Sequence, residues 1–584
     1  MSSSRRLVLT LLAILIILAA VTPPAAAMTI DLRHTFFSRK GSWMTLFPTE
    51  RSGTLRLFFS RIKEEQGNLL DLTALVQGVA RPMALTALPS HLVLSAGGAS
   101  APKARIYCAG PCDAVIDAEG MDFALNSVQT SLDLAKVRQL DEQTLSVGFD
   151  NWVLRIELSQ GAARQAAENR WILAARQGHL RIALRLYQGP TPERLQPLPD
   201  RDIPCIAADW TAWLERMPSV PPERLAMARA AWWNLWSLYA PKGGEFVTEA
   251  VLMAKADMNS FWPWDNCFVA LALGMIDLPS AWDQLLLPFR NADADGQLPD
   301  QMLPGDVFRG CTKPPIHGWT LMRLMDRHMI PDSMLLDFYP MLVAWTEFWF
   351  RKRDTDGNGI PAYGSEHSGW ESGWDNATVL PDPKQSYEAP DLQAYLVLQM
   401  KALARVAAKL GKTKEAENWD QRATRHLQRL QSEFWNGRSF VVKAVGGPTP
   451  DPDPTSLLPL MPLVLGEWLN KDIFQTLAHR LQDRFLTPIG PATEDPMSPR
   501  YLPDGYWRGP VWAPTALLLA DGLRRGGCMD LAREIACRFC DTVDHAGGHY
   551  ENYDSLSGKG LRCRGFAWTS AVDLVFRHDY LQFR

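Results

Sequence analysis

The segment GPTPERLQPLPDRDIP, residues 189–204, divides this chain of 584 residues into two parts with different hydrophobic periods. It carries five prolines, and proline fits poorly into both helices and central strands. We therefore predict a linker over 196–219. A single hydrophobic core rarely extends beyond about 250–300 residues, so a chain of this length is expected to form at least two domains.

The part before the linker has short apolar runs separated by Gly, Asn, Ser and Pro. Two of these runs, 54–60 and 180–187, alternate apolar and polar residues. A period of two is typical of strands that bury one face. Several such runs in succession favour an antiparallel β-sandwich over 28–195.

The part after the linker changes to a period of about 3.6 residues, which is typical of helices. A helix is expected to open at Pro221-Pro222, after Ser219, because proline is favoured in a first turn. No strand-like alternation separates the helix-length segments that follow. We therefore predict a toroid of paired helices over 220–584, in a chain that is multidomain and mainly α. A solenoid of helical repeats is the alternative, but no fixed sequence period supports it.

The N-terminus has the pattern of a signal peptide over 1–27. Arg5-Arg6 precede an apolar run at 7–21, and Ala25-Ala26-Ala27 offers a small-residue cleavage site. We predict a periplasmic or secreted protein, with an uncleaved N-terminal anchor as the alternative. No later stretch reaches about 20 uninterrupted apolar residues, so no stable membrane span is expected after cleavage. The net charge of −4 gives no reason to expect a nucleic-acid partner.

Four segments of the helical part combine acidic, aromatic and glycine residues: 261–268, 370–376, 506–512 and 548–554. The second reads Trp370-Glu-Ser-Gly-Trp-Asp-Asn376. Acidic groups beside large aromatic rings can hold a sugar and protonate a glycosidic oxygen. We therefore predict a glycosidase with two carboxylates. On the residues alone, Glu371 and Asp375 are rival proton donors, Asp265 is a third candidate, and Glu551 is the second carboxylate.

The order of these motifs resembles that in glycoside hydrolase family 63 and the related mannosylglycerate hydrolases, with trehalases as more distant relatives. The resemblance covers about 220–584 and implies a catalytic (α/α)6 barrel. The motifs that carry it are Trp264-Asp265, Glu371-Ser-Gly-Trp-Asp375-Asn, Tyr506-Trp-Arg-Gly-Pro510, Tyr550-Glu-Asn-Tyr-Asp554 with Gly558-Lys-Gly560, and Phe566-Ala-Trp-Thr-Ser570.

The resemblance implies that Asp375 is the general acid and Glu551 the general base of an inverting reaction. Such carboxyl groups stand about 6.5–9.5 Å apart, which leaves room for the attacking water. We expect burial against Trp370 and Trp374 to raise the pKa of Asp375, because desolvation disfavours its charged form. Donors within 550–553 are expected to keep Glu551 ionised.

The remaining site residues are expected to bind the sugar. Asp265 is implied to accept from its hydroxyl groups, with a helix cap as the alternative role, and Glu371 is expected to hold neighbouring groups in place. For each aromatic ring the alternative is core packing. His317, Asp300 and Gln301 are weaker binding candidates. The predicted substrate-binding residues are Trp262, Trp264, Asp265, Glu371, Trp374, Tyr506, Trp507, Arg508, Trp512, Tyr553 and Trp568.

A weak metal pattern occurs at Asp354-Thr-Asp356-Gly-Asn358-Gly359, which matches the first half of a calcium loop. It lacks the bidentate glutamate at the twelfth position, which here is Ser365. A polar turn is the alternative interpretation. The predicted reaction requires no cofactor, and a calcium ion here would be structural.

These patterns together predict an exported, inverting α-glycoside hydrolase that cleaves short α-glucosides or α-mannosides. Its partner is a small oligosaccharide or glycoside. A trehalase-like disaccharide hydrolase or phosphorylase is one alternative, and a catalytically inactive carbohydrate-binding protein is another. Ser555 and the stretch 511–515 depart from the pattern of the resembled family, which leaves the sugar and its aglycone open.

Overall fold

The computed structural model describes residues 28–98, 100–128, 133, 136–190, 202–364, 366–447 and 450–582. The predicted signal peptide and residues 196–201 of the predicted linker lie outside these ranges. The described chain forms two compact units. The first contains 28–33, 46–58 and 68–216, and the second contains 34–45, 59–67 and 217–582.

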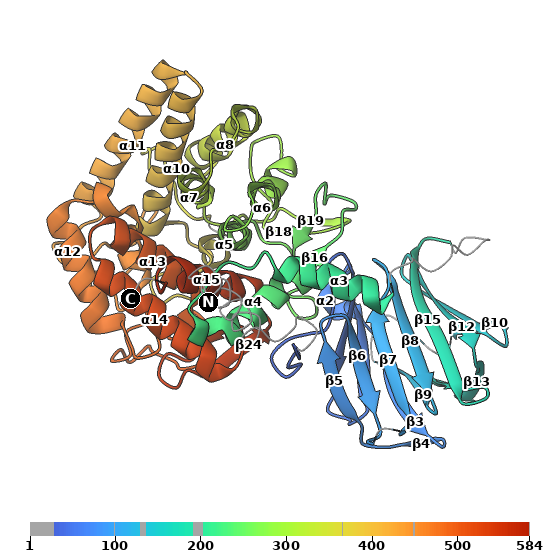
Figure 1. The fold of residues 1–584 in the computed structure, drawn as a ribbon. Helices are drawn as coiled ribbons and strands as arrows, with labels where there is room; N and C mark the ends of the chain where they lie inside the picture. The colour runs from blue at the N-terminus through green and yellow to red at the C-terminus, as the bar shows by residue number, and fades with distance from the viewer. Residues whose placement is uncertain are drawn as a thin grey trace, which may run out of the picture. The chain divides into compact units, whose positions relative to one another are not determined.

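The first unit is built from two antiparallel sheets (Figure 1). One has the strand order β1-β2-β3-β9-β14-β13, with β4 also paired to β3, and the other has the order β10-β11-β12-β15-β8-β7-β6-β5. The strands are β1 Met44–Pro48, β2 Thr54–Phe59, β3 Asn68–Val76, β4 Val79–Ala80, β5 Ala84–Leu88, β6 His91–Ser95, β7 Lys103–Cys108, β8 Asp113–Glu119, β9 Asp122–Ser127, β10 Arg138–Asp141, β11 Thr144–Phe149, β12 Trp152–Gln160, β13 Ala162–Ala167, β14 Arg170–Ala174 and β15 His179–Gln188.

The alternation in the sequence is the physical cause of these strands. Along β12, every second side chain from Trp152 to Leu158 is buried, and those between them are partly exposed. Successive side chains of a strand point to opposite faces, so this pattern buries one face of the sheet. The predicted antiparallel β domain is confirmed. The description of the chain as mainly α is not, because this whole unit is dominated by sheet.

The segment predicted as a linker is helical in part. Residues 203–214 form α3, Ile203–Leu214, with Asp202 as its N-cap and Pro204 in its first turn. Ile206, Trp210 and Trp213 are buried. The prolines suggested a break in structure, but a proline near a helix start costs no hydrogen bond. The domain limit at 195 also omits two short segments, 34–45 and 59–67, that join the second unit.

The second unit is helical. Its helices are α2 Glu64–Gly67, η3 Pro222–Arg224, α4 Leu225–Leu238, α5 Pro263–Leu273, α6 Leu278–Arg290, α7 His317–Arg327, α8 Asp332–Lys352, α9 Ser368–Ser372, α10 Pro390–Lys409, α11 Thr413–Glu433, η4 Leu458–Trp468, α12 Lys471–Arg480, η5 Leu481–Phe485, α13 Ala513–Arg525, α14 Met529–Ala546 and α15 Ala567–Asp579.

Six of these elements form a closed inner ring. In the order α5, α7, α10, η4, α13 and α15, each contacts the next, and α15 contacts α5 again. Outer helices cover them: α6 packs on α5, α11 on α10, α12 on η4, α14 on α13 and α4 on α15. Figure 1 shows α10 and α11 side by side. A double ring of this kind is the arrangement of an (α/α)6 barrel.

Inner and outer helices differ in their patterns of burial. All residues of α13 from Ala513 to Leu523 are buried, as expected for a helix that is covered on every side. The outer helix α11 buries only one stripe, Ala423, His426, Leu427 and Leu430. These positions follow the spacing of a single helical face. The sequence therefore assigns each helix to its layer.

Short strands connect several helices, and the sequence did not reveal them. They are β16 Tyr239–Ala240, β17 Ala250–Val251, β18 Gln301–Leu303, β19 Asp306–Phe308, β20 Tyr387–Glu388, β21 Lys443–Ala444, β22 Val511–Trp512, β23 Tyr550–Tyr553 and β24 Gly560–Arg564. Strands β22, β23 and β24 form one antiparallel sheet. At two to five residues each, these strands are too short for a period of two to be recognised.

A buried ion pair holds β23 to the barrel. Asp573 of α15 accepts from Arg577 Nε at 2.8 Å and lies 3.0 Å from His549 Nε2. Asp573 and Arg577 are both fully buried. Burial alone would raise the pKa of Asp573, but Arg577 and His549 lower it to about 2. The carboxylate therefore stays charged and fixes the strand that follows His549.

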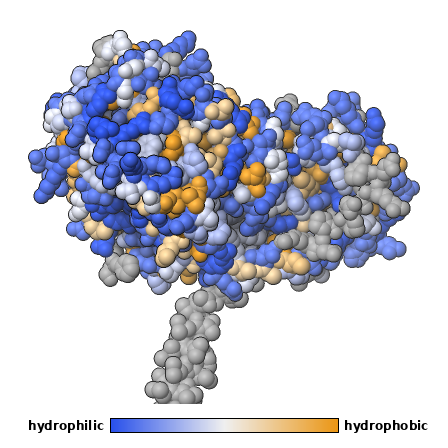
Figure 2. All heavy atoms as spheres, turned by 90° about the horizontal axis from the view of Figure 1, so that it is seen from above, coloured by the Kyte–Doolittle hydropathy of each residue, from blue (hydrophilic) through white to orange (hydrophobic). Residues whose placement is uncertain are grey.

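No helix among the described residues is long and apolar enough to cross a membrane. On the face drawn in Figure 2, hydrophobic side chains gather only in small patches among hydrophilic ones.

We predict that Asp573→Ala lowers the free energy of unfolding of the helical unit by about 3–5 kcal/mol, because it removes a partner from a buried charge. Urea denaturation followed by circular dichroism measures this change. Asp420→Ala is the control, since Asp420 is largely exposed and forms an ion pair with Lys401, and it should cost less than about 1 kcal/mol. Equal effects of the two variants would contradict the assigned role of Asp573.

Candidate active site

One cavity of the helical unit lies where the inner helices α5 and α15 begin. Eight of its twelve lining residues belong to the predicted site, so motifs that are far apart in the sequence meet here. The lining residues are Met258, Trp262, Trp264, Asp265, Lys313, Gly373, Asp375, Tyr506, Trp507, Glu551, Phe566 and Trp568.

Asp375 reaches the cavity through a tight turn. Helix α9 ends at Ser372, and Gly373 follows in the left-handed conformation with a φ of 71°. A Cβ atom on Gly373 would stand 2.6 Å from the indole of Trp264. Only glycine permits both this backbone angle and this approach. Burial raises the pKa of Asp375 in spite of the nearby Lys313, which lowers it.

The next residue, Asn376, ties this turn to a second loop. Its side-chain Nδ2 donates to the carbonyl of Gly505 at 3.0 Å, and its Oδ1 accepts from the backbone N–H of Trp507 at 2.9 Å. These two hydrogen bonds flank Tyr506. The turn that carries Asp375 and the loop that carries Tyr506 are therefore held together by one amide group.

Glu551 lies on β23 and is 4% exposed. Its Oε1 accepts from the hydroxyl of Tyr506 at 2.9 Å. Burial raises the pKa of Glu551 to about 7, although the Tyr506 hydrogen bond and Arg562 lower it. The sequence predicts that donors within 550–553 keep this carboxylate ionised. The donor comes from another loop instead, and the group is only partly ionised near neutral pH.

Backbone strain is concentrated around this carboxylate. Among the described residues, six that are not glycine have a positive φ, and Met258, Tyr506 and Arg562 are three of them. Met258 and Tyr506 line the cavity, and the Arg562 guanidinium lies 5.5 Å from the centre of the Tyr506 ring. A left-handed angle at a bulky residue costs about 1–3 kcal/mol, and such residues cluster at functional sites.

The aromatic residues form a continuous packed wall. The rings of Trp507 and Trp512 stack with centroids 4.0 Å apart, and Trp568 contacts both Trp512 and Trp264 edge to face. Trp507 also packs against Trp374, at 4.8 Å. Trp264, Trp507 and Trp568 line the cavity, so the wall offers a few ring edges and faces rather than open platforms.

Asp265 stands in the first turn of α5 and is 5% exposed. No hydrogen-bond partner for its Oδ2 occurs in the described part of the chain. Burial raises the pKa of Asp265 well above its ordinary value, against the influence of Lys313. A buried polar atom without a partner is costly. Asp265 is therefore suited to a ligand hydroxyl.

Lys313 is a cavity residue that the sequence analysis missed. Its Nζ lies 3.1 Å from Asp300 Oδ1 and donates to the carbonyl of Trp370 at 2.7 Å. Burial works against its charge, but Asp300 and Asp375 raise the pKa of Lys313. It therefore brings a fixed positive charge to the acidic cavity.

Several predicted binding residues do not line this cavity. Glu371 is 2% exposed, and its carboxylate accepts from Arg353 and from the backbone N–H of Gly364. It supports the turn before Asp375, which agrees with its expected holding role but not with sugar binding. Arg508 donates to the carbonyl of Arg500 at 3.2 Å instead of reaching the cavity.

Three aromatic residues of the predicted binding set are packed inside the protein and do not line the cavity. Tyr553 is fully buried, and its hydroxyl donates to the carbonyl of Gly548 at 2.8 Å. Trp512 is fully buried and donates from Nε1 to the carbonyl of Tyr506 at 3.0 Å. Trp374 packs behind Trp507. The interpretation as core packing holds for these three rings.

Two further expectations are corrected. Trp370 does not bury Asp375, because its side chain is 48% exposed and stacks on His367 with ring centroids 4.5 Å apart. His317 is buried between Phe289 and Trp345, and burial lowers its pKa to about 3. It is a neutral core residue. The motifs showed where these residues stand in the chain but not which way they face.

The proposed calcium loop makes its own hydrogen bonds. Asp354 Oδ2 accepts from the N–H of Gly359 at 2.9 Å, and Asn358 Nδ2 donates to Asp356 at 3.0 Å and to Glu388 at 2.6 Å. In the described ranges, no group of three or more His, Cys, Asp or Glu side chains is placed to hold a metal ion. These hydrogen bonds are those of a polar turn, and a calcium ion at this loop stays a prediction.

The missed cavity residues differ in the signal that they left in the sequence. Gly373 lies inside the motif at 371–376, and Phe566 opens the motif at 566–570. The sequence therefore indicates both as residues near the site. Lys313 stands directly before Pro314-Pro315, four residues before His317, and belongs to none of the four aromatic motifs. Met258 precedes the first aromatic motif and carries no chemical signal of its own.

Comparison with known proteins agrees with this geometry. A family model described as "Mannosylglycerate hydrolase MGH1-like glycoside hydrolase domain" matches residues 258–569, which include every residue that lines the cavity. The chain belongs to this MGH1-like glycoside hydrolase family. The resemblance drawn from the motifs is thereby confirmed, and the protein is a glycoside hydrolase.

Relatives of the MGH1-like enzyme include proteins with two named activities. Mannosylglycerate hydrolase MGH1 of Selaginella moellendorffii is 25% identical over 399 residues, which cover 54% of this chain and 79% of that protein. A periplasmic trehalase of Salmonella paratyphi B is 30% identical over 228 residues, which cover 35% of this chain and 38% of that protein.

Two solved structures share the fold. A GH63 mannosylglycerate hydrolase from Thermus thermophilus, in complex with Tris, superposes with a TM-score of 0.53 at 20% identity, over 60% of this chain and 99% of that chain. A bacterial glucoamylase complexed with acarbose reaches a TM-score of 0.64 at 10% identity, over 96% of both chains. The second match extends over the β unit as well as the helical unit.

We predict that Gly373→Ala abolishes most activity and lowers stability, because the new Cβ would strike Trp264. Gly411→Ala is a matched control: Gly411 has a φ of 72° and no atom within 4 Å of its Cβ position. Backbone strain alone should cost each variant about 1 kcal/mol. Thermal unfolding and an activity assay separate the two effects. Loss of activity in both variants, or in neither, would contradict the role given to the contact with Trp264.

Proposed function

We propose that this protein is an exported, inverting α-glycoside hydrolase that cleaves short α-glucosides or α-mannosides. Asp375 is the general acid and Glu551 the general base. The observation that carries the proposal is the meeting of both carboxyl groups in one cavity, each with a raised pKa and a different partner. Export rests on the sequence pattern at 1–27 alone.

The acid and the base are distinguished by their surroundings. The Tyr506 hydroxyl donates to Glu551 and so favours its ionised form, in which it can take a proton from water. Burial raises the pKa of Asp375 and so favours its protonated form, in which it can protonate the leaving oxygen. The charge of Lys313 limits that rise in pKa, because a neighbouring cation favours the carboxylate.

Substrate binding is supported by polar and aromatic groups that line the cavity. Asp265 Oδ2 is buried without a partner among the described residues, and a carboxyl group can both accept from and, when protonated, donate to a sugar hydroxyl. Trp262, Trp264 and Trp568 also line the cavity, and a pocket of apolar rings with a few polar groups is typical of ligand sites.

Hydrolysis of a trehalose-like disaccharide is the second candidate. The 30% identity to a periplasmic trehalase favours it, whereas the matches to mannosylglycerate hydrolases favour a mannoside. A panel of mannosylglycerate, trehalose, α-linked disaccharides and aryl α-glycosides distinguishes the two. Binding without turnover of any member would contradict hydrolysis and favour an inactive carbohydrate-binding protein.

Replacement of the two carboxylates should have different signatures. We predict that Asp375→Asn lowers kcat on disaccharides by about 10²–10⁴-fold but retains much of the activity on dinitrophenyl α-glycosides, whose leaving group needs no proton. Glu551→Gln should be impaired on every substrate. Asp382→Asn, an exposed carboxylate on the same loop as Asp375, is the control. Full activity in either variant, or the reverse pattern, would overturn the assignment.

The pH dependence tests the state of the base. Because Glu551 acts only when ionised and has a pKa of about 7, kcat/KM should fall as the pH falls through about 7. We predict that Tyr506→Phe moves this acidic limb upward by about one pH unit, because it removes a hydrogen bond to the ionised form. Tyr501→Phe, whose hydroxyl contacts Ser555, should leave the limb in place. A downward shift would contradict Glu551 as the base.

A further inference from the structure

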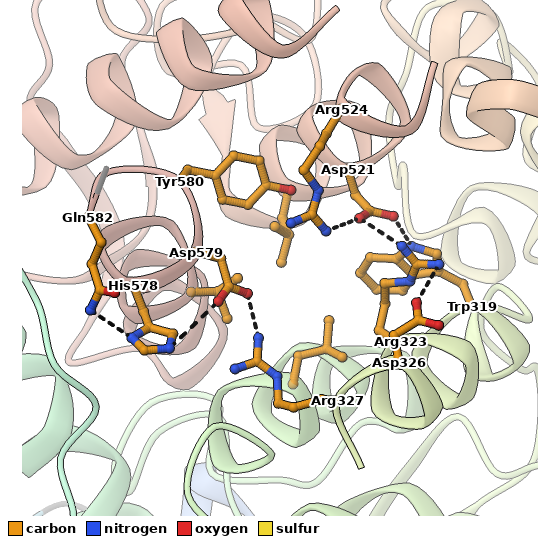
Figure 3. Close-up of a pocket in the computed structure, with 13 residues that line it drawn as sticks. Trp319, Arg323, Asp326, Arg327, Asp521, Arg524, His578, Asp579, Tyr580 and Gln582 are labelled. Carbon is orange, nitrogen blue, oxygen red and sulfur yellow. Dashed lines mark hydrogen bonds and ion pairs between the residues drawn. The ribbon is translucent and has the colours of Figure 1, made fainter. Parts of the chain in front are cut away.

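A second cavity lies at the opposite end of the inner helices from the candidate active site. It is lined by residues of α5, α7, α13 and α15, most of them in the C-terminal half of their helix, and by Tyr580 and Gln582 after α15 (Figure 3). Trp568 at the start of α15 lines the first cavity, and Asp579 at its end lines the second. At 1.5 Å per residue these positions lie roughly 16 Å apart along the helix. The two cavities are therefore separate.

The second cavity has the dimensions of a ligand site. Its volume is about 430 Å³, within the range of roughly 300–1,000 Å³ that is usual for small-molecule pockets. Only residues of the helical unit line it. A cavity of this size at the end of a closely packed barrel is not required by the packing of the helices.

Two polar atoms at this cavity are buried without a partner in the part of the chain that the structure describes: the hydroxyl of Tyr580 and Nε of Arg323. Tyr580 is 3% exposed. Figure 3 shows its hydroxyl pointing inward, toward Arg524 and Asp521. A buried donor or acceptor that lacks a partner is costly. Tyr580 and Arg323 both line this cavity, so a ligand with hydroxyl groups is the kind of molecule that could supply the missing partners.

The charges at the cavity are nearly balanced. Asp521 accepts from Trp319 Nε1 at 2.8 Å and from Arg524 at 2.9 Å, and Arg327 bonds to Asp579 at 2.6 Å. The C-terminal ends of the helices add a partial negative charge. Neither a strongly anionic nor a strongly cationic ligand is favoured. The connected ionic groups are Arg323, Arg327, Arg405, Arg524 and Arg525 with Asp326, Asp521, Asp579 and Glu467.

The rest of the lining points to a neutral ligand with many hydroxyl groups. Guanidinium and carboxylate groups provide donors and acceptors side by side, and a hydroxyl can both donate and accept. Leu271, Leu517 and Val575 supply apolar contacts for C–H groups. We propose that this second cavity binds a small neutral sugar or polyol, at a site separate from the catalytic one.

The test uses the full protein with Asp375→Asn, so that hydrolysis does not interfere. Isothermal titration calorimetry with glucose should show two binding events per chain. Adding Tyr580→Phe removes the hydroxyl and keeps the ring, and it should weaken one event about fivefold, the effect of one neutral hydrogen bond. The other event, at the catalytic cavity, should not change. In the protein with Asp375 intact, Tyr580→Phe should leave hydrolysis unaltered.

Tyr187→Phe is the matched control. It also removes a buried tyrosine hydroxyl without a partner among the described residues, but on β15 of the first unit, and it should change neither event. The absence of any event that Tyr580→Phe weakens, whether one event or two are seen, would overturn the second site. Tighter binding of gluconate than of glucose at the event sensitive to Tyr580 would overturn its neutral character. A single event that Tyr580→Phe weakens would mean that glucose does not bind at the catalytic cavity. That result would contradict the proposed function and leave the second site supported.

Discussion

One side-chain amide connects the two halves of the candidate catalytic machinery. Asn376 follows the proposed acid directly, and it hydrogen bonds to both residues that flank Tyr506. Tyr506 in turn donates to the proposed base, Glu551. Only an amide supplies a donor and an acceptor in this geometry. The position of the acid relative to the base therefore depends on two hydrogen bonds and one tyrosine hydroxyl, although the two carboxylates are far apart in the sequence.

The residues around Tyr506 hold it in a strained backbone conformation, which costs conformational energy. Tyr506 keeps a left-handed backbone angle, and the neighbouring Trp507 is fixed between Trp374 and Trp512. On the other side, β23 is anchored by His549 and the buried charge of Asp573. Strained residues persist only where their surroundings determine them strongly. The packed tryptophans are thus better understood as the frame of the site than as sugar platforms.

Much of this could be predicted from the sequence, and the failures have physical causes. The change of period near Gly189 predicted the order of the two units. The motifs predicted that Asp375, Glu551 and Asp265 belong to one site, and all three line the same cavity. Periodicity could not reveal strands of two to five residues. It also missed helix α3, because α3 begins within the proline-rich segment. Residue type could not tell which tryptophans face the cavity. Lys313 was missed because its role depends on contacts with Asp300 and Asp375, and no local pattern encodes them.

The two proposed catalytic carboxyl groups determine the stereochemistry expected of the reaction. Burial raises the pKa of both carboxyl groups, and a separate neighbour lowers each one, Lys313 for Asp375 and Tyr506 for Glu551. An acid and a base that act on opposite sides of the sugar must invert the anomeric carbon. Proton NMR of the first sugar released from an α-glycoside measures this directly. If Asp375 and Glu551 act as proposed, the β-anomer forms first, and first release of the α-anomer would contradict their roles.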